Sequence, residues 1–285
     1  MQHVTILGIL NLTRDSFSDG GRYLSPADAI AHAERLREDG ADVIDVGAES
    51  THPDADDVPA SEEIARLEAV VPELRRRGLR VSVDTHKPSV MARADAWGVE
   101  FLNDVNALRD PAAVTAARCG SARIILMHSR SIRPRAERGQ PPPDRTHAPS
   151  PDAGRGAIVP KILEFFRERV ALLEAAGLAR ERLIVDPGMG FFLGPDAGDS
   201  LDVLRQFAAL REMGRPLLIS VSRKSFVGQV LAEGGAPRPV HHRAAGTLAA
   251  ELWAAQHGAE YVRTHEPRPL RDGLRMLDAI ARGAP

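Results

Sequence analysis

Disulfide bonds, membrane spans and a strong charge of one sign are all missing from this sequence. Cys119 is the only cysteine, so no disulfide can form within the chain, and a reducing compartment suits it. No apolar run approaches the roughly 20 residues of a membrane-spanning helix, and the first residues lack the pattern of a secretory signal peptide. The net charge of -2 gives no positive field for nucleic acid or an anionic membrane. We expect a cytoplasmic enzyme or binding protein for small molecules.

The sequence also lacks a recognisable metal site made of protein side chains. It has no cysteine cluster and no helical His-x-x-x-His pair, and the adjacent His241 and His242 cannot share one helical face. A magnesium ion that arrives on a diphosphate and touches one protein oxygen fits better, because Mg²⁺ tends to keep its waters.

A regular alternation of short apolar runs and longer amphipathic segments is present. The apolar runs span residues 4–10, 43–46, 81–83, 99–102, 124–127, 183–185, 217–221 and 261–262. Helix-like segments lie between and after them, at residues 25–40, 61–78, 88–98, 111–119, 158–177, 200–213, 243–258 and 269–281. Eight strand-then-helix units predict a single-domain (β/α)8 TIM barrel over residues 1–285. An open doubly wound sheet is the competing architecture.

One segment, residues 129–155, interrupts the alternation. It contains six prolines among Arg, Gly, Ser and Asp residues. Because the alternation resumes beyond it, we interpret this segment as a loop insertion after the fifth strand and not as a linker between domains.

Polar residues follow every apolar run. They are Asn11; Asp45 with Glu49 and Thr51; Asp84; Asn103 with Asp104; His128; Asp186; Ser222, Arg223 and Lys224; and Arg263 with His265. Taken singly, each is typical of a helix cap or a turn. A barrel, however, gathers the carboxyl ends of its strands at one mouth, where barrel active sites lie. The eight together predict a site there.

Two groups of residues at these strand ends suggest a ligand. Asp84, Asn103 and Asp186 are acceptors in an apolar barrel and need donors, which a nitrogen heterocycle such as a pterin or purine supplies. The alternative is internal ion pairing with Lys224 or Arg263.

The second group is cationic. Residues 222–225, which include Lys224 and Ser225, follow a strand and open a helix, a favourable place for an anion. Arg263 and His265 are two positions apart after the last strand, and barrels often bind phosphate near strands seven and eight. The alternative is surface charge that flanks a strand.

Eight ordered segments resemble the signature motifs of dihydropteroate synthases. They are GILNLTxDSFSDGG from Gly8, DVGAESTxP from Asp45, SVDTxKP from Ser82, NDV from Asn103, MH from Met127, DPG from Asp186, SRKS from Ser222 and RxH from Arg263. The resemblance implies a homodimeric, Mg²⁺-dependent transferase of folate biosynthesis. That reaction condenses (7,8-dihydropterin-6-yl)methyl diphosphate with p-aminobenzoate and gives 7,8-dihydropteroate and pyrophosphate.

The resemblance also implies roles for single residues at the pterin end. Asp84, Asn103 and Asp186 would hold the pyrimidine edge of the pterin, with Lys224 over its reacting side. Asn11 would contact Mg²⁺ and the diphosphate.

At the other end, Arg263 and His265 would bind the diphosphate with help from Thr51. The helix that opens at Ser225 would receive the aminobenzoate carboxylate. A neutral aniline nitrogen displaces pyrophosphate without a strong base, so the catalytic effect would come from Mg²⁺ and from Lys224, Arg263 and His265, which stabilise the departing anion.

The departures from the family pattern cluster in loops and on the aminobenzoate side. They are Arg14 for the usual Pro, Ala48 for Gly, His52 for Arg, and Phe192-Leu193 for Gly-Lys. With residues 262–267, they resemble the plasmid-borne, sulfonamide-insensitive members, so we expect reduced sulfonamide sensitivity.

Two other functions stay open. A pterin-dependent methyltransferase barrel shares the Asp/Asn/Asp pocket but needs no cations for a diphosphate. A non-catalytic pterin-binding paralogue would bind the diphosphate without releasing pyrophosphate, and Arg14 and His52 keep this reading open.

Overall fold

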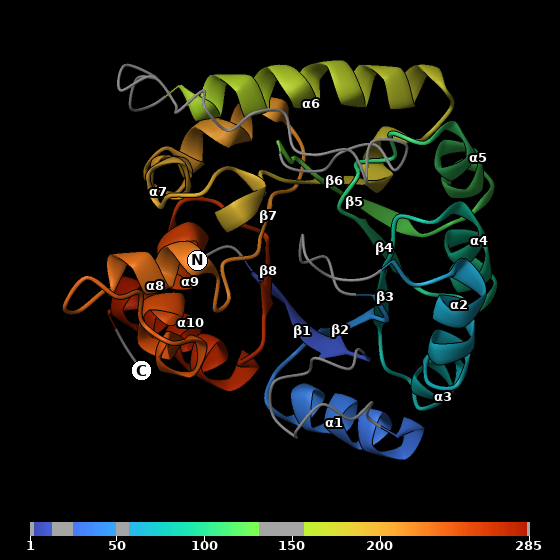
Figure 1. Cartoon of the computed structure of the whole chain (residues 1–285), viewed down its shortest axis with the longest axis horizontal. Helices are drawn as coiled ribbons and strands as arrows, with labels where there is room; N and C mark the ends of the chain where they lie inside the picture. Colours follow the sequence, from blue (N-terminus) through green and yellow to red (C-terminus); the bar gives the residue numbers. More distant parts are fainter. Residues whose placement is uncertain (1–2, 13–24, 50–56, 131–156, 284–285) are drawn as a thin grey trace.

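Eight parallel strands form one sheet in the computed structural model, which describes residues 3–12, 25–49, 57–130 and 157–283 (Figure 1). The strands are β1 (Thr5–Asn11), β2 (Val43–Gly47), β3 (Val81–Asp84), β4 (Phe101–Asp104), β5 (Arg123–Met127), β6 (Leu183–Asp186), β7 (Leu218–Ile219) and β8 (Tyr261–Thr264). Their order is β6-β5-β4-β3-β2-β1-β8-β7. A parallel bridge between Val185 and Leu217 joins the β6 and β7 ends, so the sheet closes. The predicted barrel is confirmed, and the open sheet is wrong.

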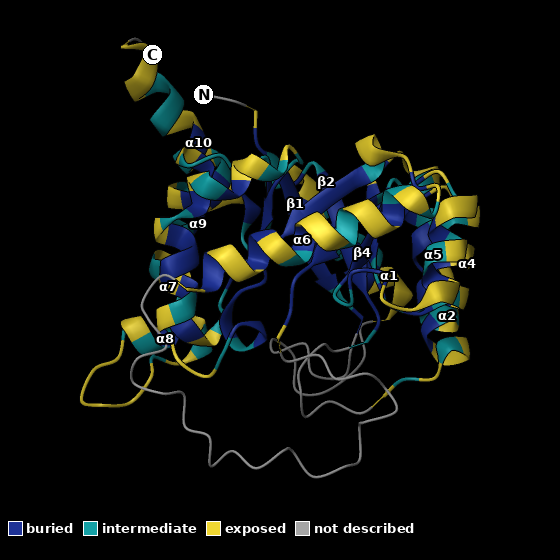
Figure 2. Ribbon diagram, turned by 90° about the horizontal axis from the view of Figure 1, so that it is seen from above, coloured by how far each residue is buried: buried dark blue, intermediate teal, exposed yellow. Residues whose placement is uncertain are grey.

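Helices surround the barrel on its outside (Figures 1 and 2). They are α1 (Pro26–Glu38), α2 (Ala60–Glu68), α3 (Val71–Arg76), α4 (Pro88–Ala96), α5 (Pro111–Cys119), α6 (Ile158–Ala175), α7 (Gly198–Arg205), α8 (Ser225–Val230), α9 (Ala244–Gln256) and α10 (Pro267–Arg282). Local signals set several starts, as where Ser25 accepts the Asp28 backbone N–H at 3.1 Å before α1. Two predicted helices are each two elements: 61–78 is α2 with α3, and 200–213 is α7 with the 3-10 helix η4 (Phe207–Met213).

Alternation along the strands separates outward from inward positions. Outward residues such as Ile44, Val83 and Leu126 belong to the main hydrophobic core under the helices. Inward residues at the amino ends of the strands form a separate apolar cluster: Leu7, Val43, Phe101, Ile125, Ile184, Leu218 and Tyr261. Figure 2 shows these buried strands inside a shell of helices whose outer faces are exposed. One end of the barrel is therefore a packed apolar plug.

Two expectations from the sequence concern the proline-rich insertion and membrane-spanning helices. The proline-rich insertion falls almost wholly within residues 131–156, outside the described part of the chain. Within the described ranges, no helix has both the length and the apolar character to cross a bilayer.

Candidate active site

Apart from Ile9 and Met127, most inward positions next to the apolar plug are polar, and they lie at the carboxyl ends of the strands. Strand register places Asp84 of β3 beside Gly47 of β2 on one side and beside Asn103 of β4 on the other. The same alternation turns Asp45, Asp186 and Arg263 inward. Most of the predicted strand-end residues of the described chain therefore lie at one mouth. Asp104 and His128 turn away from it: the Asp104 carboxylate accepts the Leu108 N–H, and the His128 ring packs against Phe165 of α6.

Asn11 ends β1 at this mouth. A Cβ built on Gly47 would lie 3.7 Å from Asn11 Oδ1 and 3.7 Å from the Asp84 Cβ, so these side chains flank one small gap. The described residues contain no group of three or more His, Cys, Asp or Glu side chains able to bind a metal ion. A cation held by one amide oxygen and by oxygens of a ligand fits this arrangement.

Arg263 of β8 lies between two carboxylates. Its Nε donates to Asp45 Oδ2 at 2.5 Å, and its Nη2 donates to Asp84 Oδ2 at 2.9 Å. Burial raises the pKa of Asp84 to about 7; the charge of Arg263 opposes this rise, and Asp45 adds to it. Burial lowers the pKa of Arg263, but the two carboxylates outweigh burial and leave it raised. The internal ion pair that the sequence left open is present, and it links a predicted pterin residue to a predicted diphosphate residue.

Asp186 and Lys224 lie near each other at the mouth, and the charge of each affects the pKa of the other. Burial raises the pKa of Asp186 to about 6 against the charge of Lys224, and burial lowers the pKa of Lys224 to about 8 against that of Asp186. Asp186 Oδ1 accepts the Gly188 N–H at 2.8 Å, and Lys224 Nζ donates to the Met189 carbonyl at 3.2 Å. Gly188 has a φ of 71°, and a Cβ there would lie 2.2 Å from the His128 carbonyl oxygen, so the turn requires glycine.

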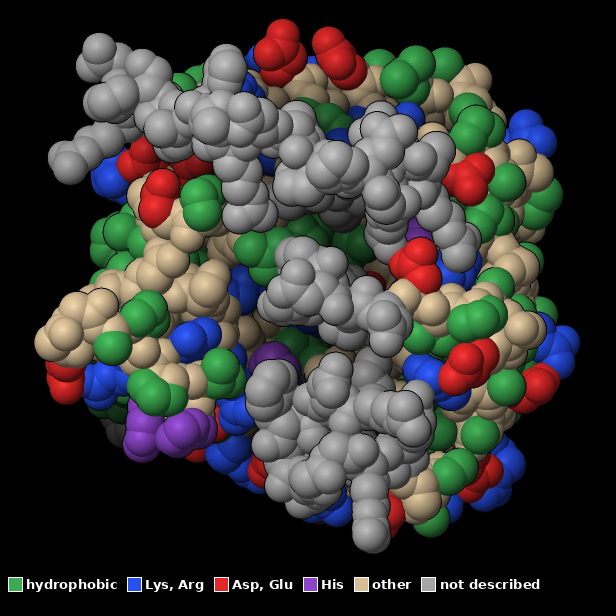
Figure 3. Space-filling model, viewed as in Figure 1, with side chains coloured by type: hydrophobic (Ala, Val, Ile, Leu, Met, Phe, Trp, Pro, Cys, Tyr) green, Lys and Arg blue, Asp and Glu red, His purple; other side chains and the backbone are tan. Residues whose placement is uncertain are grey.

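His265 lies beside these cations and stays neutral. Burial lowers its pKa to about 3, and Arg223 and Arg263 add to the effect. Ser222 Oγ accepts the His265 backbone N–H at 3.1 Å and lies 2.9 Å from Nδ1. In the tautomer whose Nδ1 accepts the Ser222 hydroxyl proton, the neutral ring carries its own proton on Nε2 and can donate it to a ligand. In Figure 3, Lys, Arg and His side chains face the centre of the mouth from the side of α8 and α9.

The 3-10 helix η3 (Gly190–Phe192) brings the substituted segment to the mouth. The ring centroid of Phe192 lies 4.6 Å from Lys224 Nζ, and η3 contacts α8, which opens at Ser225. Leu193, in contrast, is buried in the main hydrophobic core beneath the helices. Of the two adjacent substitutions, Phe192 is the one at the site.

A buried ion network that the sequence pattern does not predict lies beside the mouth. Lys87 Nζ donates to Glu49 Oε2 and to Glu63 Oε2, each at 2.6 Å. Glu49 Oε1 also accepts the Val58 N–H at 3.1 Å. Lys87 thereby ties the chain on both sides of residues 50–56 to α2. The motif around Lys87 offered a signal, but Glu63 on an amphipathic helix gave none.

Several predicted residues lie outside the described chain, namely Thr51, Arg14 and His52. The role of Thr51 and the effects of the substitutions at Arg14 and His52 therefore stay predictions.

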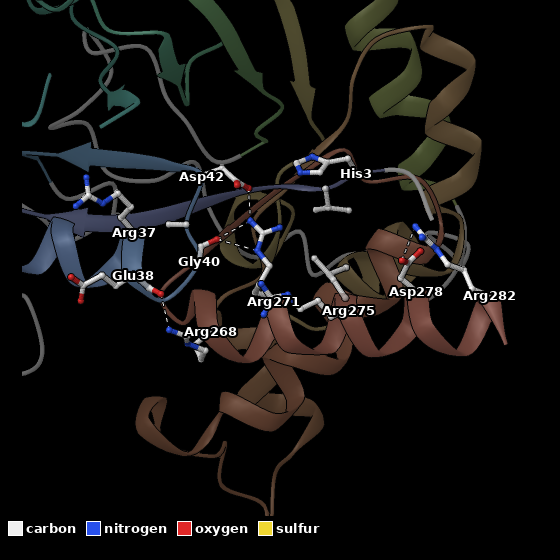
Figure 4. Close-up of a pocket in the computed structure, with 13 residues that line it drawn as sticks. His3, Arg37, Glu38, Gly40, Asp42, Arg268, Arg271, Arg275, Asp278 and Arg282 are labelled. Carbon is white, nitrogen blue, oxygen red and sulfur yellow. Dashed lines mark hydrogen bonds and ion pairs between the residues drawn. The ribbon is translucent and has the colours of Figure 1, made fainter. Parts of the chain in front are cut away.

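A cavity of about 570 Å³ lies at the opposite end of the barrel, between the end of α1, the residues that precede β1, and α10 (Figure 4). Its arginines are engaged locally: Arg271 pairs with Asp42 at 2.6 Å, and Arg282 pairs with Asp278 at 2.9 Å. None of the predicted site residues lines it. We therefore place the site at the mouth.

Comparison with known proteins agrees with this geometry. The family model described as pterin binding enzyme matches residues 7–265. Dihydropteroate synthase type-2 of Escherichia coli is 47% identical over 96% of this chain and 95% of its own length. The solved Xanthomonas albilineans dihydropteroate synthase with 4-aminobenzoic acid has a TM-score of 0.84 at 36% identity, covering 98% of this chain and 93% of that one. Its complex with 7,8-dihydropteroate has a TM-score of 0.80 at 35% identity, covering 98% and 94%.

Proposed function

Because this chain belongs to the pterin-binding enzymes, and among them to the dihydropteroate synthases, we propose that its barrel mouth carries out that family's condensation. The enzyme is a transferase of folate biosynthesis that joins (7,8-dihydropterin-6-yl)methyl diphosphate to p-aminobenzoate. The products are 7,8-dihydropteroate and pyrophosphate. The single observation that carries this conclusion is the 47% identity over 96% of the chain. The lone Cys119 supports a cytoplasmic location.

The pterin ring would bind between Asp84, Asn103 and Asp186. The ring presents amino and N–H donors, and these three inward side chains present oxygen acceptors from β3, β4 and β6. With a pKa of about 6, Asp186 is mostly ionised at neutral pH and accepts strongly. Lys224, whose Nζ donates to the Met189 carbonyl, would then lie beside the reacting methylene.

The diphosphate would bind at Lys224, Arg263 and His265, with Thr51 as a further donor. Asn11 would offer its amide oxygen to Mg²⁺, which when bound neutralises charge on the departing diphosphate. The aniline nitrogen forms the new C–N bond while the C–O bond to the diphosphate breaks. Pyrophosphate leaves, and the nitrogen loses its extra proton to solvent. The cations act on charge that develops in the transition state, where preorganised groups have their largest effect.

The aminobenzoate would lie between η3 and the start of α8, with its carboxylate near Ser225. Phe192 stands at this position, where the family pattern has a small glycine. We propose that its bulk lowers sulfonamide sensitivity, because the drugs extend beyond the outline of p-aminobenzoate at the end opposite the aniline.

Pyrophosphate release tests the proposal against the remaining alternatives. Purified enzyme with Mg²⁺ and the dihydropterin diphosphate should release pyrophosphate only after p-aminobenzoate is added, with one dihydropteroate formed per pyrophosphate. A non-catalytic paralogue would retain the diphosphate unchanged. A methyltransferase barrel would bind a reduced pterin without discriminating in favour of the diphosphate.

We also propose that the enzyme is a homodimer through α9 and α10. These helices pack against each other and expose Trp253, Met276 and Ile280, with 46%, 62% and 65% of each residue accessible. Large exposed apolar groups on adjacent elements are typical of interfaces. Sedimentation should give a dimer, and Met276→Glu with Ile280→Glu should give a monomer. Leu172→Glu on α6 is the control and should leave the dimer intact.

A further inference from the structure

Helix α9 packs on the outer side of the segments that carry Lys224 and Arg263, the cations of the mouth. Its buried residues Thr247 and Glu251 lie one turn apart. Thr247 Oγ1 accepts the Arg223 backbone N–H at 3.1 Å, which holds the turn before Lys224. Glu251 accepts a hydrogen bond from the side chain of Thr264. Thr264 is the β8 residue between the two predicted diphosphate ligands of that strand.

The surroundings of Glu251 are unusual for a carboxyl group. It is 2% exposed, and its Oε1 is buried with no hydrogen-bond partner in the described chain. It lines a cavity of about 130 Å³ together with Glu266 and Pro269 at the start of α10. The remaining lining comes from Thr247 and apolar residues of α9 itself. Among the residues that line this cavity, Glu266 is the one other charged group, and its sign is the same.

These surroundings disfavour a charge on Glu251. Burial raises its pKa to about 8; the Thr264 hydrogen bond opposes this rise, and Glu266 adds to it. The carboxyl is therefore mostly uncharged at pH 7 and becomes a carboxylate in mildly alkaline solution. A full negative charge at this place would offset part of the positive charge that the mouth presents.

We propose that Glu251 is a positioning residue of the diphosphate subsite: it fixes Thr264 between Arg263 and His265 and, while it is uncharged, adds no second negative charge to that of Glu266 behind them. The inference rests on the proposed function, because it assumes a diphosphate at this subsite. Glu251 touches no substrate and acts through β8.

Glu251→Gln tests the inference, because glutamine copies the size and polarity of the uncharged acid but cannot ionise. The readouts are KM for the dihydropterin diphosphate and inhibition by inorganic pyrophosphate with Mg²⁺, each measured from pH 6.5 to 9.5. At pH 6.5 the variant should match wild type within about twofold. At pH 9.5 wild type should bind both diphosphates about fivefold more weakly than the variant, the effect expected of one partly screened charge. KM for p-aminobenzoate should stay equal.

Two controls separate this effect from others. Lys224 also titrates near pH 8, but it does so in both proteins, so its effect cancels in the ratio of the wild-type KM to the variant KM. Glu168→Gln on the exposed face of α6 removes a distant carboxylate and should leave the ratio at one throughout.

The inference is overturned if wild type and Glu251→Gln show the same pH dependence. It is also overturned if the variant loses activity equally at every pH together with thermal stability, because Glu251 would then be only structural. If the wild-type enzyme releases no pyrophosphate, the proposed function is overturned, and this inference with it. If turnover is normal but the ratio of wild-type to variant KM does not change with pH, only the inference is overturned.

Discussion

At the scale of single residues, the mouth is built from groups whose charge depends on their neighbours. Asp186 points into the proposed pterin position, so its removal should leave ring donors without a partner and should not collapse the barrel. We expect Asp186→Ala to weaken binding of the dihydropterin diphosphate about a hundredfold, from about 2–3 kcal/mol for a lost charged acceptor. Calorimetric titration measures the affinity, and circular dichroism checks the fold. If the variant binds with wild-type affinity, Asp186 does not contact the pterin.

His265 separates diphosphate recognition from pterin recognition better than Arg263 does. Arg263→Ala would leave Asp45 and Asp84 buried without their shared cation, which should destabilise the fold by about 3–5 kcal/mol. His265 is neutral and hydrogen-bonded to Ser222, so its loss is milder. We expect His265→Ala to lower kcat/KM for the diphosphate substrate at least about tenfold and to leave the affinity for bare dihydropterin unchanged. Equal losses for both ligands would place His265 in the pterin pocket.

At the scale of elements, the sequence predicted the strand ends well and the helix breaks poorly. Asn11, Asp84 and Asp186 could be found because each follows a short buried run and a period of two fixes its direction. The break between α2 and α3 did carry a signal, since Pro72 lies in the first turn of α3. The amphipathic pattern on both sides of Pro72 nevertheless made segment 61–78 look like one helix. Pairings between distant elements, such as Lys87 with Glu63, depend on tertiary packing that local pattern does not contain.

The Lys87 network should matter for both stability and the loop that it anchors. Lys87→Met leaves Glu49 and Glu63 as buried carboxylates without a cation, so we expect a loss of about 3–5 kcal/mol in the free energy of unfolding. Denaturant titration measures this loss. Lys161→Met, at an exposed position of α6, is the matched control and should change stability by less than about 0.5 kcal/mol. Similar losses in both variants would show that the network adds little.

Phe192 gives the sharpest test of drug discrimination. Restoring the family's full Gly-Lys pair would bury a lysine at Leu193, inside the apolar core, and would confound the result with unfolding. Phe192→Gly alone removes the ring beside Lys224. We expect it to lower the Ki of sulfamethoxazole at least about tenfold relative to KM for p-aminobenzoate. A wild-type enzyme as sensitive as the variant would show that Phe192 does not obstruct the drug.

At the scale of the whole molecule, the barrel changes character along its axis. The amino end is an apolar plug of inward side chains, and the carboxyl end holds carboxyl groups that burial makes hard to ionise. The apolar end stabilises the fold. The buried polar groups at the other end lower the stability of the fold until a ligand supplies hydrogen-bond donors and cations. Function and stability therefore compete at the mouth.

The empty enzyme should consequently be more stable in mild acid than at neutral pH. Four buried carboxyl groups have pKa values of about 6 to 8, above their ordinary values near 4: Asp84, Asp104, Asp186 and Glu251. Each contributes stability that is complete below its unfolded pKa and is lost as pH rises through its folded pKa.

Two histidines act in the opposite direction. Burial lowers the pKa of His128 to about 4 and that of His265 to about 3, so their contribution is lost as pH falls below about 6.5. Four carboxyl groups outweigh two histidines between pH 5.5 and 7.5. We expect the melting temperature of the empty enzyme to be higher at pH 5.5 by roughly 5 °C, and the difference to shrink in Glu251→Gln. An equal or higher melting temperature at pH 7.5 would mean that these carboxyl groups are already ionised at pH 5.5 in the empty enzyme.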